Sequence, residues 1–361
     1  MLIYIDKTIE AHGKVSGLTD DEKILFSDLA VAHQHGYCML CGDLKSIEWL
    51  SKYLEGIHSS IFTQIRNKHT QIRAIIDVIE TMLVLSYDGQ PTVPSFFEGK
   101  YKVMLINDAL TYKLHLQCSM VAENLDDCNF YELIAQRFMH DKRIKGLHLS
   151  YRHELGGGNT INTVFHKCVE ADRVPTLCLV DSDIKYGPTA QYPGTPARGG
   201  TVKKLEETFN SLAAKSHPVT YELYCLPIHE AENLIPIAVL ESITNTLIPD
   251  MGNGVSYLRK LRDANMSDAI LCYDFKNGGN KIKDDPSVTY WIGVAEAIGD
   301  ESFPQLCTKV LEKAIDVLEG NTKDKQNQVC SVCIDSYLIN LWSEIGQKVF
   351  SWGCANQPLR A

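Results

Sequence analysis

Apolar residues in the middle of this chain fall into short continuous runs, separated by amphipathic segments of helix length. The clearest run is Pro-Thr-Leu-Cys-Leu-Val at residues 175–180, directly before Asp181 and Asp183. A continuous apolar run of this length is typical of a strand buried on both faces, at the centre of a parallel sheet. Similar runs predict further strands at residues 117–122, 144–150 and 219–226.

Amphipathic patterns between these runs predict helices at residues 128–139, 161–171 and 201–214. Asp126 and Asp127 are suitable caps for the first helix, because a carboxylate accepts hydrogen bonds from the free N–H groups of the first turn. Strands that alternate with helices imply right-handed parallel crossovers. We therefore predict an α/β fold in which helices flank a parallel sheet.

The segments on either side of this sheet carry different patterns. The elements predicted before the sheet are strands at residues 2–5 and 36–41, one amphipathic helix at 61–85 and a strand pair at 101–114. After residue 240, helical patterns dominate. We predict an N-terminal α/β cap or interaction domain (1–114), a sheet domain (115–240) and a mostly helical C-terminal region (241–361).

Composition restricts the classes of function. The 361 residues are 45% hydrophobic and 22% charged, as in an ordinary globular protein with an ample core. No apolar run approaches the roughly 20 residues that cross a bilayer, and the N-terminus lacks a basic signal-peptide start, so we expect a cytoplasmic protein. The net charge of -10 argues against extensive contacts with the phosphates of duplex DNA. A nucleic-acid substrate would therefore be held locally, through metal ions or with a partner.

Acidic residues follow three of the predicted strands. Glu123 follows the first, Asp181 and Asp183 follow the third, and Glu230 and Glu232 follow the fourth. Because parallel strands end at one edge of a sheet, where open α/β sheets bind ligands, these carboxylates should converge. Their oxygens would suit Mg²⁺ or Mn²⁺, which stabilises charge on a phosphate and activates water. The structural alternatives are a turn after the third strand, a salt bridge after the first and a helix cap after the fourth.

Other residues near this edge are candidates for substrate contact. A glycine turn before a helix offers backbone N–H groups to a substrate phosphate at Gly157, Gly158 and Asn159. Lys276, in a later glycine-rich turn, is a candidate catalytic residue that neutralises a phosphate, and its alternative is an ordinary exposed lysine. His229 is the histidine best placed for substrate contact.

Twelve cysteines are scattered along the chain, many within apolar runs, as expected in a reducing compartment. Two Cys-x-x-Cys pairs occur, Cys38 with Cys41 and Cys330 with Cys333, and Cys354 lies further on. Four thiolates would suit zinc. Core packing is the interpretation that we favour, because the first pair lies within an apolar run without glycines between the cysteines.

The order of these motifs resembles the Toprim domain shared by topoisomerases, DnaG-type primases and OLD-family nucleases. Val-Ala-Glu123 stands where the family has its catalytic glutamate, and Val-Asp181-Ser-Asp183 matches its metal-binding Asp-x-Asp. The glycine turn at 155–159 resembles one in the OLD branch, and residues 229–236 are similar to the Glu-Asn segment of anti-phage Toprim effectors.

The resemblance covers about residues 115–240 and has two departures. Asn124 follows the glutamate where many members have glycine, although asparagine tolerates the left-handed backbone that such a turn can need. The P-loop motif of the ATPase that is fused to OLD nucleases is missing from this sequence. An ATPase, if one takes part, would therefore be a separate chain.

The resemblance implies a metal-dependent endonuclease that cleaves phosphodiester bonds in DNA or RNA. Asp181 and Asp183 would hold Mg²⁺ or Mn²⁺, Glu123 would act as general base or as the ligand of a second metal ion, and Glu230 or Glu232 would complete the site. It also implies a toxic effector of anti-phage defence that a partner protein controls; the oligomeric state stays open, a homo-oligomer included. Two alternatives remain, a degenerate Toprim binding or assembly module and a primase-like nucleotidyl transferase.

Overall fold

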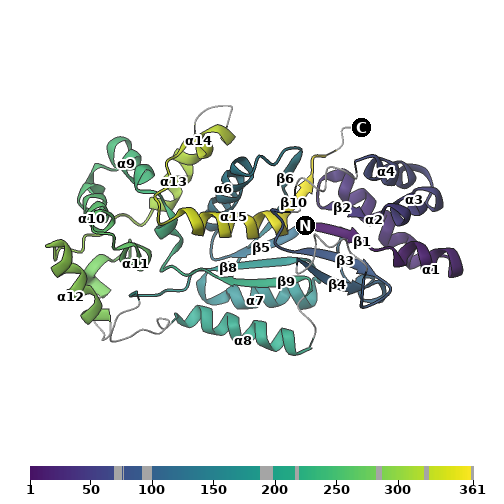
Figure 1. The fold of residues 1–361 in the computed structure, drawn as a ribbon. Coiled ribbons are helices and arrows are strands. Elements are labelled where there is room, and N and C mark those ends of the chain that lie inside the picture. The colour runs from purple at the N-terminus through teal and green to yellow at the C-terminus, as the bar shows by residue number, and fades with distance from the viewer. Residues whose placement is uncertain are drawn as a thin grey trace.

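The computed structural model describes residues 1–68, 75, 77–91, 100–187, 198–215, 219–281, 287–320 and 325–358. Two four-stranded parallel sheets lie side by side, and a helical region follows the second sheet (Figure 1). The predicted mixed α/β class, with parallel sheets flanked by helices, is confirmed.

The first sheet lies on the right of Figure 1 and has the strand order β2-β1-β3-β4, with all neighbours parallel. Its strands are β1 (Leu2–Ile5), β2 (Met39–Gly42), β3 (Met82–Ser86) and β4 (Tyr101–Leu105). Its helices are α1 (Thr8–Ser16), α2 (Asp20–His35), α3 (Leu44–Tyr53), α4 (Gly56–Asn67) and α5 (Ile106–Ala109). Strands β1, β2 and β3 are buried along their whole length, so their sequences are continuous apolar runs.

Two predictions for this region are wrong. The helix predicted at 61–85 is shorter, because α4 ends at Asn67 and the central strand β3 occupies the end of that range; residues 69–74 and 76 lie outside the described residues. A short apolar run fits a buried strand as well as a buried helix, so spacing alone did not separate them. The strand pair predicted at 101–114 is the single strand β4 followed by the short helix α5.

The second sheet has the order β7-β5-β8-β9, again with all neighbours parallel. Its strands are β5 (Cys118–Ala122), β7 (Tyr151–Leu155), β8 (Thr176–Val180) and β9 (Tyr221–Cys225). The helices that flank it are α6 (Leu125–Asp141), α7 (Ile161–His166) with its π-helical continuation (Lys167–Ala171), α8 (Gly200–Lys215) and α15 (Ile339–Gly353). Figure 1 shows α6 and α15 on one face of this sheet and α7 and α8 on the other.

The predictions for β5, β8 and β9 agree with the structure, but the strand predicted at 144–150 does not. Its C-terminal part is β6 (Leu147–Leu149), which pairs antiparallel with β10 (Cys354–Asn356) near the end of the chain. The parallel neighbour of β5 is the next segment, β7. Because β7 is a partly exposed edge strand with the sequence Tyr-Arg-His-Glu-Leu, it has no continuous apolar run to reveal it.

The first helix of the second sheet also begins earlier than predicted. Asn124 caps α6 through a capping box: its side chain accepts from the N–H of Asp127, and the Asp127 carboxylate accepts from the N–H of Asn124. The helix therefore starts at Leu125, and Asp127 lies in its first turn, close enough to Glu123 for their charges to interact.

Helices make up most of the chain after β9. They are α9 (Ile237–Thr246), α10 (Gly252–Asp263), α11 (Ser267–Leu271), α12 (Ser287–Ile298), α13 (Val310–Glu319) and α14 (Lys325–Ser331), with short 3₁₀ turns at Ala231–Leu234, Pro249–Met251 and Gly278–Lys281. Within the described ranges, none of the helices combines the length and apolar character needed to cross a membrane.

Helix α15 joins the two sheets through a buried ammonium group. Lys348 is 5% exposed, and its Nζ lies 2.7 Å from Glu80 Oε1 and 2.5 Å from Glu222 Oε1 on β9. Glu222 also receives a 3.1 Å hydrogen bond from the indole of Trp352, and Lys102 of β4 lies 3.7 Å from it. Charges from both sheets therefore meet at one point on α15.

Replacing Lys348 with methionine is expected to lower the free energy of unfolding by about 2–3 kcal/mol. A buried pair that loses one partner typically costs about 3–5 kcal/mol, and here Trp352 and Lys102 still compensate Glu222 in part. Urea unfolding measures the loss. Lys52→Met, which removes an exposed pair with Glu48, is the matched control and should change stability by less than about 0.5 kcal/mol. Equal effects of the two substitutions would contradict this account of the contact.

Candidate functional site

The carboxyl ends of β5 and β8 lie side by side at the point where the strand order of the second sheet reverses. The chain leaves β5 for β7 on one side and later returns to β8 on the other, so β5 and β8 flank a topological switch point. Glu123 directly follows β5, and Asp181 directly follows β8. Open α/β sheets bind ligands in this crevice. The candidate site is therefore built around these two carboxylates.

Five carboxylates gather here, and we call them the acidic cluster: Glu123, Asp127, Asp181, Asp183 and Glu232. Glu123 is under the influence of the negative charges of Asp183 and Glu232. Asp181 is under the influence of those of Asp127, Glu123 and Glu232. Residues that are far apart in the sequence are thus brought into one electrostatic group.

Burial and mutual repulsion raise the pKa values within the acidic cluster. Burial raises the pKa of Glu123, and the charge of Asp183 raises it further. Burial, followed by the charge of Glu232, raises the pKa of Asp127 to about 7. The pKa of Asp181 lies well above its ordinary value, again through burial and then through Asp127 and Glu123. A bound cation would offset this repulsion, and an oxygen-only donor set suits a hard divalent ion.

Hydrogen bonds orient the central carboxylate of the cluster. Asp181 accepts a 3.0 Å hydrogen bond from the N–H of Ala231 and a 3.3 Å hydrogen bond from the hydroxyl of Tyr131 on α6. Burial and the negative charge of Asp181 raise the pKa of this tyrosine well above 10, so it stays protonated as a donor. Asp181 therefore has a fixed position between α6 and the segment after β9.

Asp183 does not extend from the strand in the way that its spacing from Asp181 suggested. Alternation would place both side chains on one face only if the strand continued, but β8 ends at Val180 and Asp183 has a left-handed backbone with φ of 53°. Its side chain is exposed and packs against Gly199, where a Cβ would collide with the carboxylate. Asp183 thus lies at the rim of the site, while Asp181 lies inside.

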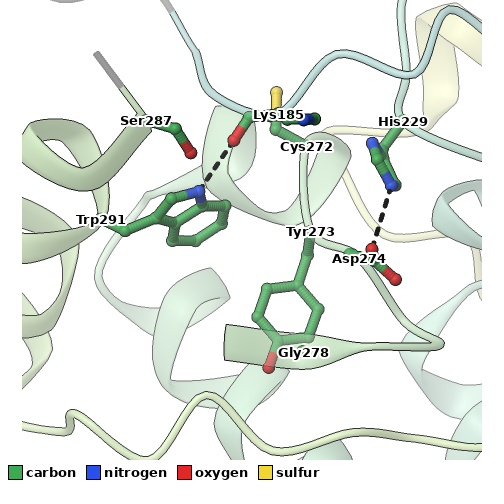
Figure 2. A pocket seen from close by; sticks show the side chains of 8 residues that line it. All are labelled: Lys185, His229, Cys272, Tyr273, Asp274, Gly278, Ser287 and Trp291. Atoms are coloured by element: carbon green, nitrogen blue, oxygen red, sulfur yellow. Dashed lines mark hydrogen bonds and ion pairs between the residues drawn. The ribbon is translucent and has the colours of Figure 1, made fainter. Parts of the chain in front are cut away.

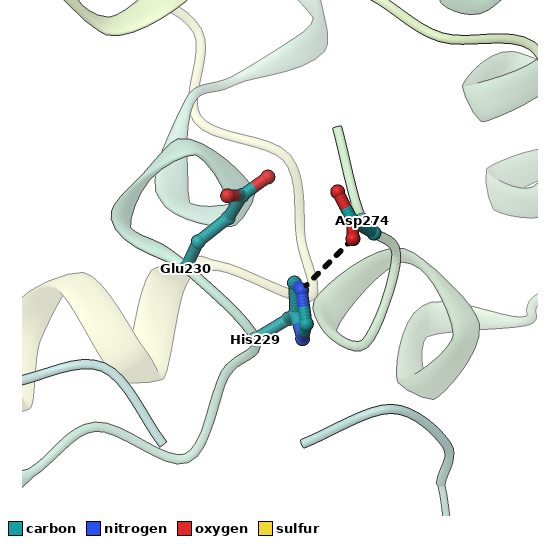
Figure 3. Close-up of side chains that lie close together, drawn as sticks. All are labelled: His229, Glu230 and Asp274. Atoms are coloured by element: carbon teal, nitrogen blue, oxygen red, sulfur yellow. Dashed lines mark ion pairs between the residues drawn. The ribbon is translucent and has the colours of Figure 1, made fainter. Parts of the chain in front are cut away.

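The metal ligands predicted from the sequence were Glu123, Asp181 and Asp183. Among the described residues, this trio does not bring its oxygens within 4.8 Å of one another. The group with that spacing is His229, Glu230 and Asp274 (Figure 3). The acidic cluster is therefore more open than a preformed three-ligand site.

The glycine turn was predicted to bind a substrate phosphate, but backbone hydrogen bonds already occupy part of it. The N–H of Gly156 donates to the carbonyl of Ala122 and that of Gly157 donates to the carbonyl of Glu123, both at 2.9 Å. The N–H of Gly157 is therefore not available to a phosphate. These bonds fix the backbone next to Glu123. Gly158 and Asn159 follow in the short 3₁₀ helix Gly158–Thr160, and Gly158 has φ of 57°.

Lys276 contacts carboxylates of the site. Its Nζ lies 3.0 Å from Glu230 Oε2 and 3.1 Å from Glu232 Oε1. Although burial lowers the pKa of Lys276, the charges of Glu232 and Glu230 raise it overall, so the side chain stays charged. Glu230 in turn accepts a 2.8 Å hydrogen bond from the N–H of Phe275. The predicted candidates Lys276, Glu230 and Glu232 are thus brought together.

The C-terminal helical region holds the backbone that follows Asp183. The Nδ1 atom of His229 lies 2.8 Å from the carbonyl oxygen of Ile184, and the indole of Trp291 on α12 donates to the carbonyl of Lys185 at 2.7 Å (Figure 2). Gly187 packs against Tyr290 of the same helix. His229 was predicted as a substrate contact, but in this structure its side chain holds the backbone at Ile184 in place.

Three residues of this region were not predicted as site residues: Asp127, Tyr131 and Asp274. Asp127 had been interpreted only as a helix cap. The signal that would have found it is its place three residues after Asn124, because a capping box turns the side chain at this position back toward the start of the helix, next to Glu123. No local pattern identifies Tyr131 or Asp274, because their partners lie in distant segments.

The cysteine pairs do not form a common site in the structure. Cys38, Cys41 and Cys354 are buried together, and burial raises the pKa of Cys38 to about 12. Cys330 lies instead beside Arg137 and Asp141. In the described part of the chain, the group spaced for a metal contains no cysteine. Burial raises the pKa of the Cys38, Cys41 and Cys354 thiols, which is consistent with core packing.

Comparison with protein-family models, with curated proteins and with solved structures found no match to this chain. The functional assignment therefore depends on the chemistry of the acidic cluster and on its place at the switch point.

Proposed function

We propose that this protein is a metal-dependent nuclease that hydrolyses phosphodiester bonds in DNA or RNA. The observation that carries the proposal is the convergence of Glu123, Asp127 and Asp181 at the switch point of a parallel sheet. The motif order that resembles the Toprim domain supports the same assignment. On this proposal the second sheet is the Toprim-like catalytic unit, the first sheet is a cap domain and the C-terminal helices support the site.

The donor set fits Mg²⁺ or Mn²⁺. Asp181 would be the central ligand, with Glu123 and Asp127 beside it and Asp183 at the rim, because carboxylate oxygens are the ligands that these ions prefer. The ion would stabilise negative charge on a phosphate and make a bound water more acidic. Glu123 would accept the proton of the attacking water. Its pKa is raised toward neutral pH, which makes it a stronger base than an ordinary glutamate.

The surrounding residues would orient these groups. Tyr131 and the N–H of Ala231 fix the Asp181 carboxylate. Lys276 holds Glu230 and Glu232 in place, and its ammonium would draw a substrate phosphate toward the acidic rim. The resemblance to anti-phage effectors extends the proposal to a toxic nuclease that a partner, such as a separate ATPase, controls.

A second candidate is a degenerate Toprim-like module that binds a partner without catalysis. The observation that favours it is the pairing of Lys276 with two of the predicted catalytic acids, which neutralises part of the site. Calorimetric titration of the wild type and Asp181→Asn with Mn²⁺ separates the two candidates, because a catalytic centre should bind Mn²⁺ in a way that Asp181→Asn removes, whereas a module without one should show no such difference.

The direct test is cleavage of single- and double-stranded DNA and RNA oligonucleotides by the purified protein with Mg²⁺, Mn²⁺ or a chelator. Cleavage should require the ion and should disappear in Glu123→Ala. Glu170→Ala is the matched control, because Glu170 is an exposed acid next to the opposite edge of the same sheet. Equal cleavage by the wild type and Glu123→Ala would refute the proposal.

A further inference from the structure

His229, Glu230 and Asp274 bring one imidazole nitrogen and two carboxylates within 4.8 Å of one another (Figure 3). The first two follow β9, and Asp274 lies in the turn after α11. All three are largely buried, at 8%, 7% and 9% exposure. We propose that this group, which we call the histidine site, binds a divalent transition-metal ion such as Zn²⁺, and that the ion has a structural role.

The imidazole of His229 has the tautomer that metal ligation requires. Its Nδ1 lies 2.8 Å from the carbonyl oxygen of Ile184, which can only accept, so Nδ1 carries the hydrogen. The lone pair of the neutral ring is then on Nε2, on the side of Asp274 (Figure 3). Metal-binding histidines usually fix their second nitrogen with a hydrogen bond of this kind.

The distance between His229 and Asp274 fits a shared cation better than a direct hydrogen bond. Nε2 lies 3.6 Å from Asp274 Oδ2, which is long for a hydrogen bond. Two ligands that each lie about 2.1 Å from a tetrahedral zinc ion are separated by about 3.4 Å. The two side chains are therefore already close to the spacing that such an ion imposes.

Backbone N–H groups hold both carboxylates in position. Asp274 Oδ1 accepts from the N–H of Lys276 at 3.1 Å and from that of Asn277 at 2.7 Å. Glu230 Oε1 accepts from the N–H of Phe275 at 2.8 Å. The side-chain amide of Asn277 also donates to Asp274, with Nδ2 3.0 Å from both carboxylate oxygens. Ligating carboxylates in metal sites are typically hydrogen-bonded by neighbouring groups in this way.

The charge balance also favours a divalent cation. Glu230, Glu232 and Asp274 carry three negative charges, and Lys276 supplies one positive charge at 3.0 Å from Glu230 and 3.1 Å from Glu232. Glu230 and Glu232 repel each other, and a divalent ion beside them would offset that repulsion together with Lys276.

A cavity beside the histidine site has room for the remaining ligand. It has a volume of about 20 Å³, and His229, Cys272, Asp274 and Trp291 are among the residues that line it (Figure 2). A volume of this size holds about one water molecule. Such a water would complete a four-ligand coordination.

The ligand types indicate the class of ion and its effect. An imidazole with carboxylates suits Zn²⁺ and related transition ions, whereas Mg²⁺ prefers oxygen alone. The ion would join the segment after β9 to the turn at Asp274 and, through His229, to the backbone at Ile184. All three segments border the acidic cluster, so the ion would stabilise the support of that cluster.

Zinc binding in paired variants tests this inference separately from the nuclease proposal. Chelator-treated protein carrying Asp181→Asn, which disables the acidic cluster, should still take up one equivalent of Zn²⁺ in a calorimetric titration and should gain thermal stability. Adding His229→Gln or Asp274→Asn should weaken that binding by more than the roughly 10–100-fold that loss of a supporting hydrogen-bond partner costs. Unchanged Zn²⁺ affinity in His229→Gln would overturn the inference.

X-ray absorption of the zinc-loaded Asp181→Asn protein provides a second measurement that needs no variant of the histidine site. We expect the spectrum to show that one imidazole nitrogen and otherwise only oxygen atoms coordinate the zinc ion. A spectrum without a histidine nitrogen would refute the site. Failure of the protein to bind zinc would also refute it and would mean that His229 and Asp274 form only an ion pair. A wild-type protein that binds zinc at this site but cleaves no nucleic acid with Mg²⁺ or Mn²⁺ would count against the nuclease proposal and not against this site.

Discussion

Replacing Asp181 with asparagine is expected to reduce metal-dependent cleavage by about 1000-fold or more without unfolding the protein. Asp181 is the proposed central ligand, and loss of the several kcal/mol that a bound ion contributes to the transition state corresponds to about three powers of ten in rate. Cleavage rates at saturating Mn²⁺ measure the effect. Retention of more than about a tenth of wild-type activity would show that Asp181 does not hold the catalytic ion.

Asparagine keeps the shape and the hydrogen bonds of Asp181. Its Oδ1 can accept from the N–H of Ala231, and its amide can donate to the hydroxyl oxygen of Tyr131. Because the substitution also removes one charge from a group of repelling carboxylates, the metal-free variant should be as stable as the wild type or about 1 kcal/mol more stable. Mn²⁺ should raise the melting temperature of the wild type by more than that of the variant. Glu170→Gln, at the opposite edge, is the control for both measurements.

The free energy of unfolding of the metal-free protein should fall as pH rises from about 4 to about 7, and Asp127 should account for much of the change. The folded protein raises the pKa of Asp127 from an ordinary 3.8 to about 7. Within that window the folded state binds more protons than the unfolded state, so stability decreases as pH increases. We expect this residue to contribute on the order of 2 kcal/mol across the window.

Asp127→Asn isolates this contribution. The amide oxygen of asparagine can replace the carboxylate as the acceptor for the N–H of Asn124, so the capping box of α6 is kept. Urea unfolding in the presence of a chelator, between pH 4.5 and pH 8, should show a flatter pH dependence for the variant than for the wild type. Mn²⁺ should stabilise the wild type more at pH 8 than at pH 5, because protons compete with the ion for the carboxylates. Parallel pH curves for the two proteins would contradict this assignment.

The apolar pattern of the sequence determined the centre of the second sheet. Strands β5 and β8 are buried on both faces, so their residues are uniformly apolar and each strand is visible without reference to the rest of the chain. Helices α7 and α8 followed from their own periodicity. Since parallel strands that are connected by helices end at one edge, the positions of Glu123 and Asp181 at that edge also followed from the sequence alone.

The existence of β3 and β7 and the pairing of β6 did not follow from the sequence. β7 is an edge strand with polar residues, and β6 pairs with β10 near the other end of the chain. β3 falls within what its spacing suggested was a helix, because burial on both faces of a sheet produces the same short apolar run as a buried helix. In each case tertiary contacts, rather than local preference, chose between the alternatives.

For the candidate site, the sequence determined which acids lie at the edge of the sheet, because that depends only on where each strand ends. The tertiary structure decided which groups pair. Lys276 contacts Glu230 and Glu232, and His229 faces Asp274 from a different segment. The physical reason is that hydrogen bonds and charge interactions act over a few ångströms in space, whereas sequence patterns report only neighbours along one strand or one helix.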